Sequence, residues 1–275
     1  MALGGLLFLL AAGFSLIFGL MRIANLTHGA LYMLGAYIGV SILKAVPNLW
    51  AAAVLSGLVV ALFGGLLEKL ILRKLGGNVL GQVLVTLGIA FILADFCLVV
   101  WGGDPIPVPT PAFLQQPVRI AGLAFPAYRL AVVIIAIAVG LFLYLFIERT
   151  RLGAMIRAGV DDREMARGVG IPVSRLFTTV FCLGAALAGA GGVIGGPIMS
   201  AYPGLDSDML PLALIVVILG GAGSLLGAFV GSFIVGFIYN FGIALVPDLA
   251  YFVLFLPMVL VLVFLPQGLF GRVQL

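Results

Sequence analysis

Apolar runs long enough to cross a lipid bilayer follow one another along almost the whole chain. A helix needs about 20 residues to cross the roughly 30 Å hydrocarbon core, and helices satisfy their backbone hydrogen bonds internally, as lipid requires. Eight runs come close to the required length, near residues 2–21, 29–45, 51–72, 79–101, 129–148, 176–198, 225–245 and 250–267. A ninth, shorter run lies near 208–221. We therefore expect an all-α polytopic membrane protein with about eight full transmembrane helices and one short or broken helical arm.

Composition agrees with this prediction. The chain is 64% hydrophobic and 9% charged, whereas soluble domains are about half apolar and a quarter charged. So little polar sequence leaves no room for a sizeable aqueous domain, so residues 1–275 are expected to form a single transmembrane domain. No basic patch with interleaved aromatic residues suggests nucleic-acid binding. Cys97 and Cys182 lie in apolar runs and are expected to pack as buried thiols rather than to hold a metal.

One segment, "ERTRLGAMIRAGVDDREMARGVGIPVSRLF" (148–177), concentrates charge in this apolar chain. Basic residues beside membrane spans mark the cytoplasmic side, so the loop 149–174 is predicted to be cytoplasmic and the Pro-rich loop 102–128 external. Counting spans from there puts the N-terminus outside and the C-terminus inside. The runs 208–221 and 225–245 must then form a hairpin. Its turn "GGAGS" supplies the predicted helix break, at Gly220, Gly221, Gly223 and Ser224.

The charged loop has the pattern of an amphipathic helix. Asp161 and Asp162 suit the N-terminus of the segment Asp162–Gly168 through the helix dipole. The apolar side is predicted to comprise Ala154, Ile156, Val160, Met165 and Ala166. Two interpretations stay open on the residues alone. In the first, the helix is solvated at the membrane interface, and its arginines fix the topology of the chain. In the second, the helix is presented to a cytoplasmic partner.

The loop and four other blocks carry a resemblance to a known family. The pattern R-A-x-x-D-x-x-x-A-x-x-x-G-I resembles the coupling segment of ABC-importer permeases. The blocks "FGLMRIANLTHGALYMLGAY" (18–37), "FCLGAALAGAGGVIGG" (181–196), "ILGGAGSLLGAFVG" (218–231) and "LVFLPQGLFGR" (262–272) are similar to permeases for branched-chain amino acids. Two features depart from the family: Ala30 stands at an often acidic position, and the loop 102–128 is specific to this chain.

The resemblance implies a transport subunit of a bacterial inner-membrane importer, with no catalytic residue of its own. Its implied partners are two ATPase subunits, a second permease subunit (identical or paralogous) and a periplasmic solute-binding protein. ATP and Mg²⁺ would be bound by the ATPase, because this sequence contains no G-x-x-x-x-G-K-[ST] phosphate-binding loop. No cofactor or metal is expected in this chain. The residues implied in ATPase coupling are Arg157, Ala158, Asp161, Asp162, Arg163, Ala166, Gly170 and Ile171.

Polar residues within apolar runs are candidates for the transport pathway, because they are costly in lipid. Asn25, Thr27 and His28 form one group, and Gln82 and Thr86 form a second group on one helix face. Asn25 to His28 either cap the second helix or lie beside the pathway at a helix break.

Three classes of function remain open. The first is the permease of an ATP-driven importer that works by alternating access, with branched-chain or related amino acids as the leading solutes. The second is a stand-alone secondary transporter or channel for a small solute such as urea or an amide. The third and weakest is an intramembrane hydrolase built from Ser224 and His28, because no third orienting group is evident.

Overall fold

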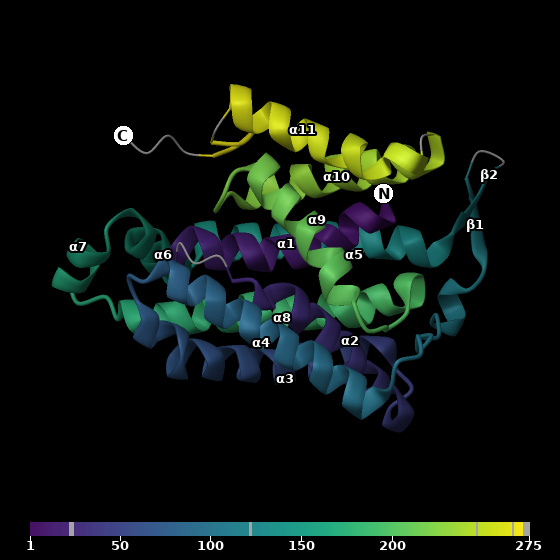
Figure 1. Ribbon diagram of the computed structural model, residues 1–275, viewed down its shortest axis with the longest axis horizontal. Coiled ribbons are helices and arrows are strands. Elements are labelled where there is room, and N and C mark those ends of the chain that lie inside the picture. The colour runs from purple at the N-terminus through teal and green to yellow at the C-terminus, as the bar shows by residue number, and fades with distance from the viewer. Residues whose placement is uncertain (22–24, 121–122, 246, 266, 272–275) are drawn as a thin grey trace.

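The computed structural model describes residues 1–21, 25–120, 123–245, 247–265 and 267–271, and helices dominate it (Figure 1). The short elements are strands β1 (Pro117–Ile120) and β2 (Leu123–Pro126) and the 3₁₀ turns η1 (Leu72–Leu75), η2 (Ala112–Leu114) and η3 (Pro247–Leu249). The helices are α1 (Ala2–Met21), α2 (Thr27–Ala45), α3 (Leu49–Leu70), α4 (Val79–Trp101), α5 (Ala127–Arg149), α6 (Arg151–Asp161), α7 (Arg163–Gly168), α8 (Val173–Met199), α9 (Leu205–Gly220), α10 (Leu225–Leu245) and α11 (Ala250–Phe264).

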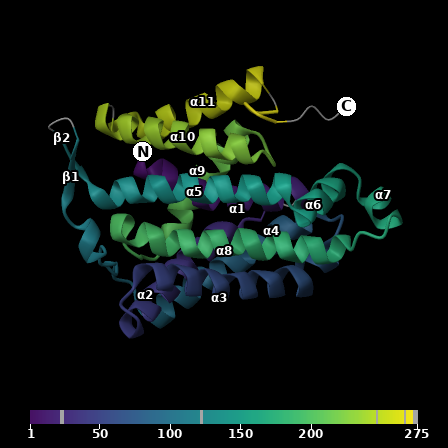
Figure 2. The same cartoon turned by 180° about the vertical axis from the view of Figure 1, so that it is seen from behind.

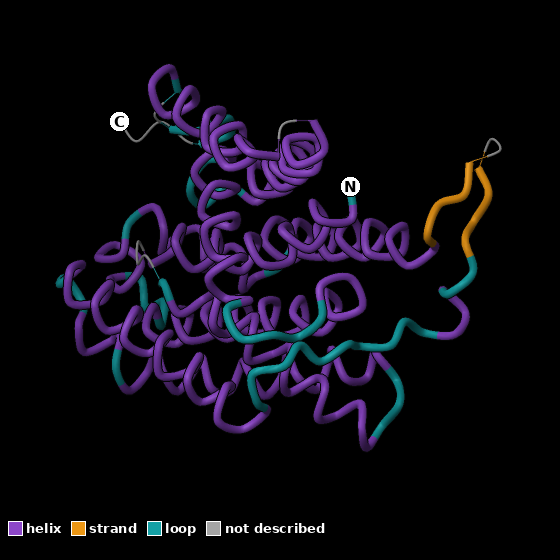
Figure 3. The backbone as a smooth tube through the Cα atoms, turned by 45° about the vertical axis from the view of Figure 1, so that its right-hand side comes forward, coloured by secondary structure: helices purple, strands orange, loops and turns teal. Residues whose placement is uncertain are grey.

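The long helices run roughly along the longest axis of the molecule, so the bundle has two distinct ends (Figures 1 and 2). α6 and α7 lie at one end, which we call the loop end. The strands β1 and β2 project from the opposite, hairpin end, toward which the N-terminus also lies (Figure 3). The charged loop and the Pro-rich segment are therefore at opposite ends, as the span count predicts.

Six helices among the described residues are long and apolar enough to cross a membrane: α1, α3, α4, α5, α8 and α10. The predicted count of about eight full spans is thus not confirmed. α2 has 19 residues, but His28 and Lys44 lower its hydropathy. α11, expected over 250–267, has only 15 residues, too few for the hydrocarbon core at 1.5 Å per residue. α9, with 16 residues, is short as expected.

The turn from α9 to α10 depends on glycines with left-handed backbone. Gly221 has φ 98° and Gly223 has φ 81°, a region that side chains with a Cβ rarely occupy. Beyond the turn the two helices pack closely against each other. A Cβ built on Gly231 would lie 3.0 Å from the carbonyl oxygen of Val216. The predicted hairpin at 220–224 is therefore present.

The segment 268–270 closes the end of α9. The backbone N–H of Leu269 donates to Leu219 O at 2.9 Å, and that of Phe270 donates to Gly220 O at 3.0 Å. The last carbonyls of a helix have no donor within the helix. A segment distant in sequence supplies two of those donors here.

Small residues on α8 allow close packing within the chain. Gly184 and Gly192 are buried, and a Cβ on Gly184 would lie 2.8 Å from the carbonyl oxygen of Gly13 in α1. A Cβ on Gly57 of α3 would likewise lie 3.0 Å from Ala186 O of α8. Such close approach is typical of helices associating in lipid, and it places α8 at the centre of the bundle against α1, α2 and α3.

The Pro-rich segment contains structure that the all-α expectation omits. β1 and β2 pair antiparallel, with Pro117 opposite Pro126. Ile106 forms an isolated bridge with Ala201, which ties the segment to the connection between α8 and α9. Proline blocks helix formation here, so the chain forms an extended hairpin instead.

Candidate functional site

The charged loop consists of two short helices, α6 and α7, joined at Asp162. Asp162 has an extended backbone (φ −147°, ψ 109°). Its Oδ1 accepts hydrogen bonds from Glu164 N and Met165 N, both at 2.9 Å. Asp162 is therefore the N-cap of α7, which begins at Arg163. Asp161 is the last residue of α6 and is exposed.

α6 is fixed to the end of α5 by polar contacts. Thr150 Oγ1 accepts a hydrogen bond from Gly153 N at 3.0 Å and so caps α6. The Arg157 guanidinium donates to the carbonyl oxygen of Ile147 and lies 3.4 Å from the Glu148 carboxylate. A cation near the last carbonyls of a helix is favourable. Arg157 thus joins α6 to α5, and the neighbouring Ala158 is half-buried.

The end of α7 turns sharply into α8. Gly170 has φ 85°, and its N–H donates to Arg167 O at 3.0 Å. The N–H of Ile171 donates to Ala166 O at 2.9 Å. Ala166 is buried and Ile171 is half-buried. These bonds hold α7 next to the start of α8 at Val173.

The exposed apolar residues of the loop differ in part from the expected ones. Ile156 and Ala166 are buried as predicted, but Met165 is 65% exposed and Ala154 is exposed. The break at Asp162 interrupts the helical repeat, so positions on α7 do not continue the buried face of α6. Val169, which directly follows α7, is likewise 69% exposed.

The start of α2 lies inside the bundle rather than at its edge. His28 Nε2 is 3.0 Å from the carbonyl oxygen of Leu10, halfway along α1, and its ring lies edge-on to Phe14 with centroids 5.5 Å apart. Asn25 Oδ1 accepts a hydrogen bond from Thr27 N at 3.2 Å. The three polar side chains Asn25, Thr27 and His28 are completely buried. Asn25 accepts from the N–H of Thr27, the first residue of α2, but the N-cap residue Leu26 has no side-chain cap. The capping role and the pathway role of these residues both stay predictions.

Thr86 belongs to the same polar cluster, whereas Gln82 does not. Thr27 Oγ1 donates to Thr86 O at 2.8 Å, and Leu26 N donates to Thr86 Oγ1 at 3.3 Å. Gln82 Nε2 instead donates to Leu75 O at 3.1 Å, toward the loop end. Both side chains are buried, but they serve different contacts.

Two buried nitrogen atoms of this cluster have no hydrogen-bond partner among the described residues: Asn25 Nδ2 and His28 Nδ1. Buried polar groups are normally paired. The chain alone therefore leaves hydrogen-bonding capacity unused beside the middle of α1. A solute with polar groups could use it if the helices moved apart.

A buried carboxylate near the loop end escapes the sequence prediction. Glu68 in the last turn of α3 has a fully buried side chain. Its two oxygens accept hydrogen bonds from Arg73 Nε (3.1 Å) and from one terminal guanidinium nitrogen of Arg73 (2.8 Å). Thr178 Oγ1 donates to Glu68 at 2.8 Å. The available signal is an acid five residues before an arginine at the end of an apolar run, but the partner on α8 is 110 positions away.

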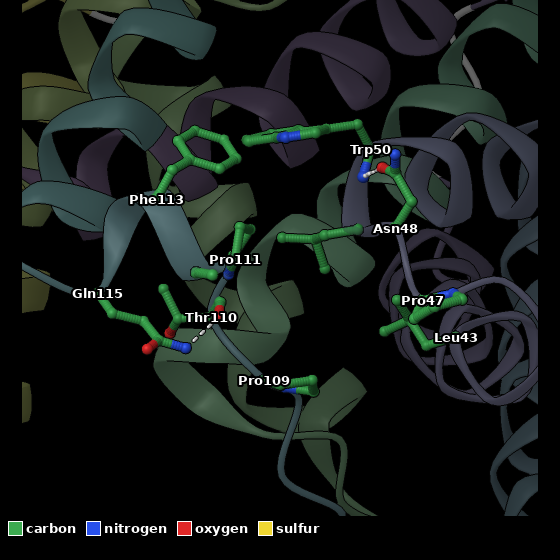
Figure 4. A pocket seen from close by; sticks show the side chains of 11 residues that line it. Leu43, Pro47, Asn48, Trp50, Pro109, Thr110, Pro111, Phe113 and Gln115 are labelled. Atoms are coloured by element: carbon green, nitrogen blue, oxygen red, sulfur yellow. Dashed lines mark hydrogen bonds between the residues drawn. The ribbon is translucent and has the colours of Figure 1, made fainter.

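The hairpin end carries a pocket of about 410 Å³ between the α2–α3 connection and residues 109–115. Its lining is largely apolar, and the side chains of Trp50 and Phe113 point toward each other across it (Figure 4). Phe113 is 72% exposed. Gln115 Nε2 donates to Thr110 O at 3.0 Å. The Pro-rich segment forms one side of the pocket, and the α2–α3 connection forms the other.

The structure gives no support to a Ser–His pair. Ser224 Oγ accepts a hydrogen bond from Gly227 N at 3.0 Å, whereas His28 is bound to Leu10 O. Within the described ranges, no group of three or more His, Cys, Asp or Glu side chains is placed to hold a metal ion. Cys97 and Cys182 are free thiols.

Comparison with known proteins shows which family this chain resembles. Residues 1–262 match the family described as the permease component of branched-chain amino acid transport systems, which is a transport component and not an enzyme. The chain is 30% identical to the high-affinity branched-chain amino acid permease BraD of Pseudomonas aeruginosa, over 96% of this chain and 91% of that protein. It is 28% identical to the corresponding permease LivH of Escherichia coli, over 98% and 92%.

More distant matches include a sugar permease, the xylose/arabinose import permease XylH of Sulfolobus acidocaldarius, 27% identical over 64% of this chain and 49% of that protein. No solved structure matches significantly. The family match covers nearly every described helix, including the polar cluster at the start of α2 and the charged loop. The chain therefore belongs to the family of permease components of branched-chain amino acid transport systems.

Proposed function

We propose that this chain is the membrane-spanning permease subunit of an ATP-driven importer, and that it carries branched-chain or related amino acids. The observation that carries the proposal is the two-helix loop at one end of an apolar bundle. It is the main polar element that the chain offers to a partner in water, and it is anchored to both α5 and α8. A subunit without its own nucleotide-binding loop needs such an element to receive work from an ATPase.

The loop suits this role because its base is fixed and its surface is open. Ile156 packs with Leu67, Leu176 and Phe181 in a buried cluster beneath the loop. Met165 on α7 and Val169 directly after it remain exposed. These two apolar side chains give the charged loop an exposed apolar surface for contact with a partner. We infer that α7 inserts into the ATPase. α6 and the buried apolar cluster around Ile156 then transmit the motion of the ATPase to the bundle.

The solute is assigned from the relatives. The permeases that match over almost the full chain are named for branched-chain amino acids, and the sugar permease matches over about two thirds of it. The polar cluster also supports a solute with hydrogen-bonding groups, because Asn25 Nδ2 and His28 Nδ1 are buried without a partner among the described residues. Selectivity at high affinity would then reside in an external solute-binding protein.

The mechanism follows from these assignments. Two permease subunits, this chain with an identical or related one, enclose the pathway in the bacterial inner membrane. The binding protein delivers solute at the hairpin end. Two ATPase subunits bind ATP and Mg²⁺ at the loop end, and their closure switches the pathway between its outward-open and inward-open states.

The test is reconstitution of the chain with its ATPase, second permease and binding protein in liposomes. We expect uptake of leucine, isoleucine or valine that requires ATP and the binding protein. Replacing Asp161, Asp162 and Arg163 together should abolish solute-stimulated ATP hydrolysis while membrane insertion stays intact. Uptake by the chain alone, without the ATPase, would instead establish a stand-alone transporter.

A further inference from the structure

The buried Glu68 carboxylate is part of a four-residue cluster that joins α3 and η1 to the first turns of α8. We call Glu68, Arg73, Ser174 and Thr178 the Glu68 cluster. Besides its two bonds to Glu68, Arg73 donates to Ser174 O at 3.0 Å and to Thr178 Oγ1. Thr178 in turn donates to Glu68 at 2.8 Å. Every member is therefore bonded to at least one other member across the two helices.

The cluster continues a close packing contact that runs along α3 and α8. Gly57 and Gly64 of α3 lie against Ala186 and Ala185 of α8, where an added Cβ would be 3.0 Å and 2.7 Å from its neighbour. Small residues allow the backbones of two helices to pack closely in lipid. The Glu68 cluster closes the same contact at the loop end, where α8 emerges from the charged loop.

The position of the cluster on α8 is the second part of the argument. Ser174 is the second residue of α8, directly after the turn at Gly170 to Pro172 that ends α7. This turn and α6 are the two connections of α7 to the bundle, so a displacement of α7 reaches α8 directly through the turn. Because Arg73 bonds to Ser174 and Thr178 at once, such a displacement acts on α3 together with α8.

We propose that the Glu68 cluster is a mechanical coupling point, which makes α3 and α8 respond as a unit when an ATPase moves the charged loop. This inference rests on the proposed function and adds positioning residues to it. A buried charge is costly in a membrane protein unless it is paired and hydrogen-bonded, and apolar residues would pack α3 on α8 equally well. A charged pair instead adds directional bonds at this junction, and a charge-assisted, bidentate pair has a defined geometry.

Thr178→Val tests the inference with little change in volume. The valine removes the hydroxyl that accepts from Arg73 and donates to Glu68. In the reconstituted complex we measure the amount of leucine taken up per ATP hydrolysed. We expect this ratio to fall roughly tenfold, the factor by which a hydrogen bond to a charged group shifts an equilibrium. ATP hydrolysis without solute should rise at the same time.

Thr179→Val is the matched control. Thr179 is the next residue of the same helix, and its Oγ1 donates to Arg175 O within α8 at 2.9 Å. We expect wild-type uptake per ATP. If Thr178→Val also keeps the wild-type ratio, the inference is wrong.

A second variant tests the inference if the Thr178→Val complex does not assemble. Arg73→Lys keeps the positive charge near Glu68 but loses the two parallel bonds. If Thr178→Val does not assemble, Arg73→Lys should still assemble and show the lowered ratio, and an unchanged ratio in it overturns the inference. Lack of ATP-dependent uptake by the wild-type complex overturns the proposed function itself, so the two failures are distinguishable.

Discussion

Thr27 Oγ1 lies 2.8 Å from the carbonyl oxygen of Thr86 and donates a hydrogen bond to it. The bond joins the first residue of α2 to the middle of α4, and both side chains are completely buried. Hydrogen bonds between helices in lipid contribute modestly to stability, but they define which faces meet. This one fixes the place where the second helix begins.

Thr27→Val should therefore weaken the contact between α2 and α4 without creating a cavity. We expect a loss of about 1 kcal/mol in the free energy of unfolding. Thermal unfolding in detergent measures the loss. Thr110→Val, in the Pro-rich segment, is a control and should leave the melting temperature unchanged. An equal effect of both variants would contradict the importance of this bond.

His28 has a packing role and a proposed pathway role that can be separated. His28→Ala removes both the bond to Leu10 O and the ring contact with Phe14. We expect a loss of about 2–4 kcal/mol in stability, in the range of large-to-small substitutions in a core. His28→Gln retains a hydrogen-bond donor and should recover part of the lost stability.

Uptake kinetics of the same two variants address the pathway role. We expect a higher KM for leucine in His28→Gln, because a group that contacts the solute changes its affinity. Unchanged KM and kcat in a stable His28→Gln protein would mean that His28 only anchors α2.

The N-cap at Asp162 predicts a contrast between two substitutions. Asp162→Ala removes the acceptor for Glu164 N and Met165 N, which costs about 1 kcal/mol of helix stability. Asp162→Asn keeps an acceptor at the same position. We expect Asp162→Ala to reduce solute-stimulated ATP hydrolysis strongly and Asp162→Asn to retain most of it. Equal losses would show that the charge matters rather than the cap.

The turn between α9 and α10 predicts sensitivity at Gly223. An alanine there would be strained at φ 81° by roughly 1–2 kcal/mol, and its Cβ would lie 2.9 Å from the Cα of Gly19. Gly77→Ala is the control, because Gly77 has φ 87° and no atom within 4 Å of an added Cβ. We expect Gly223→Ala to lower the melting temperature more than Gly77→Ala does. Similar shifts in melting temperature would mean that backbone strain alone causes the loss of stability.

Helix positions along the chain were predictable where apolar runs are long. The predicted spans 2–21, 79–101 and 225–245 agree with α1, α4 and α10, because burial in lipid requires uninterrupted apolar helix. α11 ends earlier than its apolar run, at Phe264. The two-stranded hairpin was missed, since its residues have no strong alternation.

The candidate site was predictable only in its local parts. The cap at Asp162 follows from residues next to one another, and the polar group at the start of α2 stands out against apolar sequence. The bond from Thr27 to Thr86 and the network of Glu68 with Thr178 join residues far apart in the chain. Such pairings depend on how helices rotate and tilt, which hydrophobic periodicity does not determine.

The closure of α9 by Leu269 and Phe270 bears on the order of assembly during synthesis. The α9–α10 hairpin is translated before the residues that satisfy its last carbonyls, and α10 and α11 separate the two in the chain. Until that later segment docks, the carbonyl oxygens of Leu219 and Gly220 lack these two donors. This turn therefore gains its last two hydrogen bonds only after α10 and α11 have been synthesised.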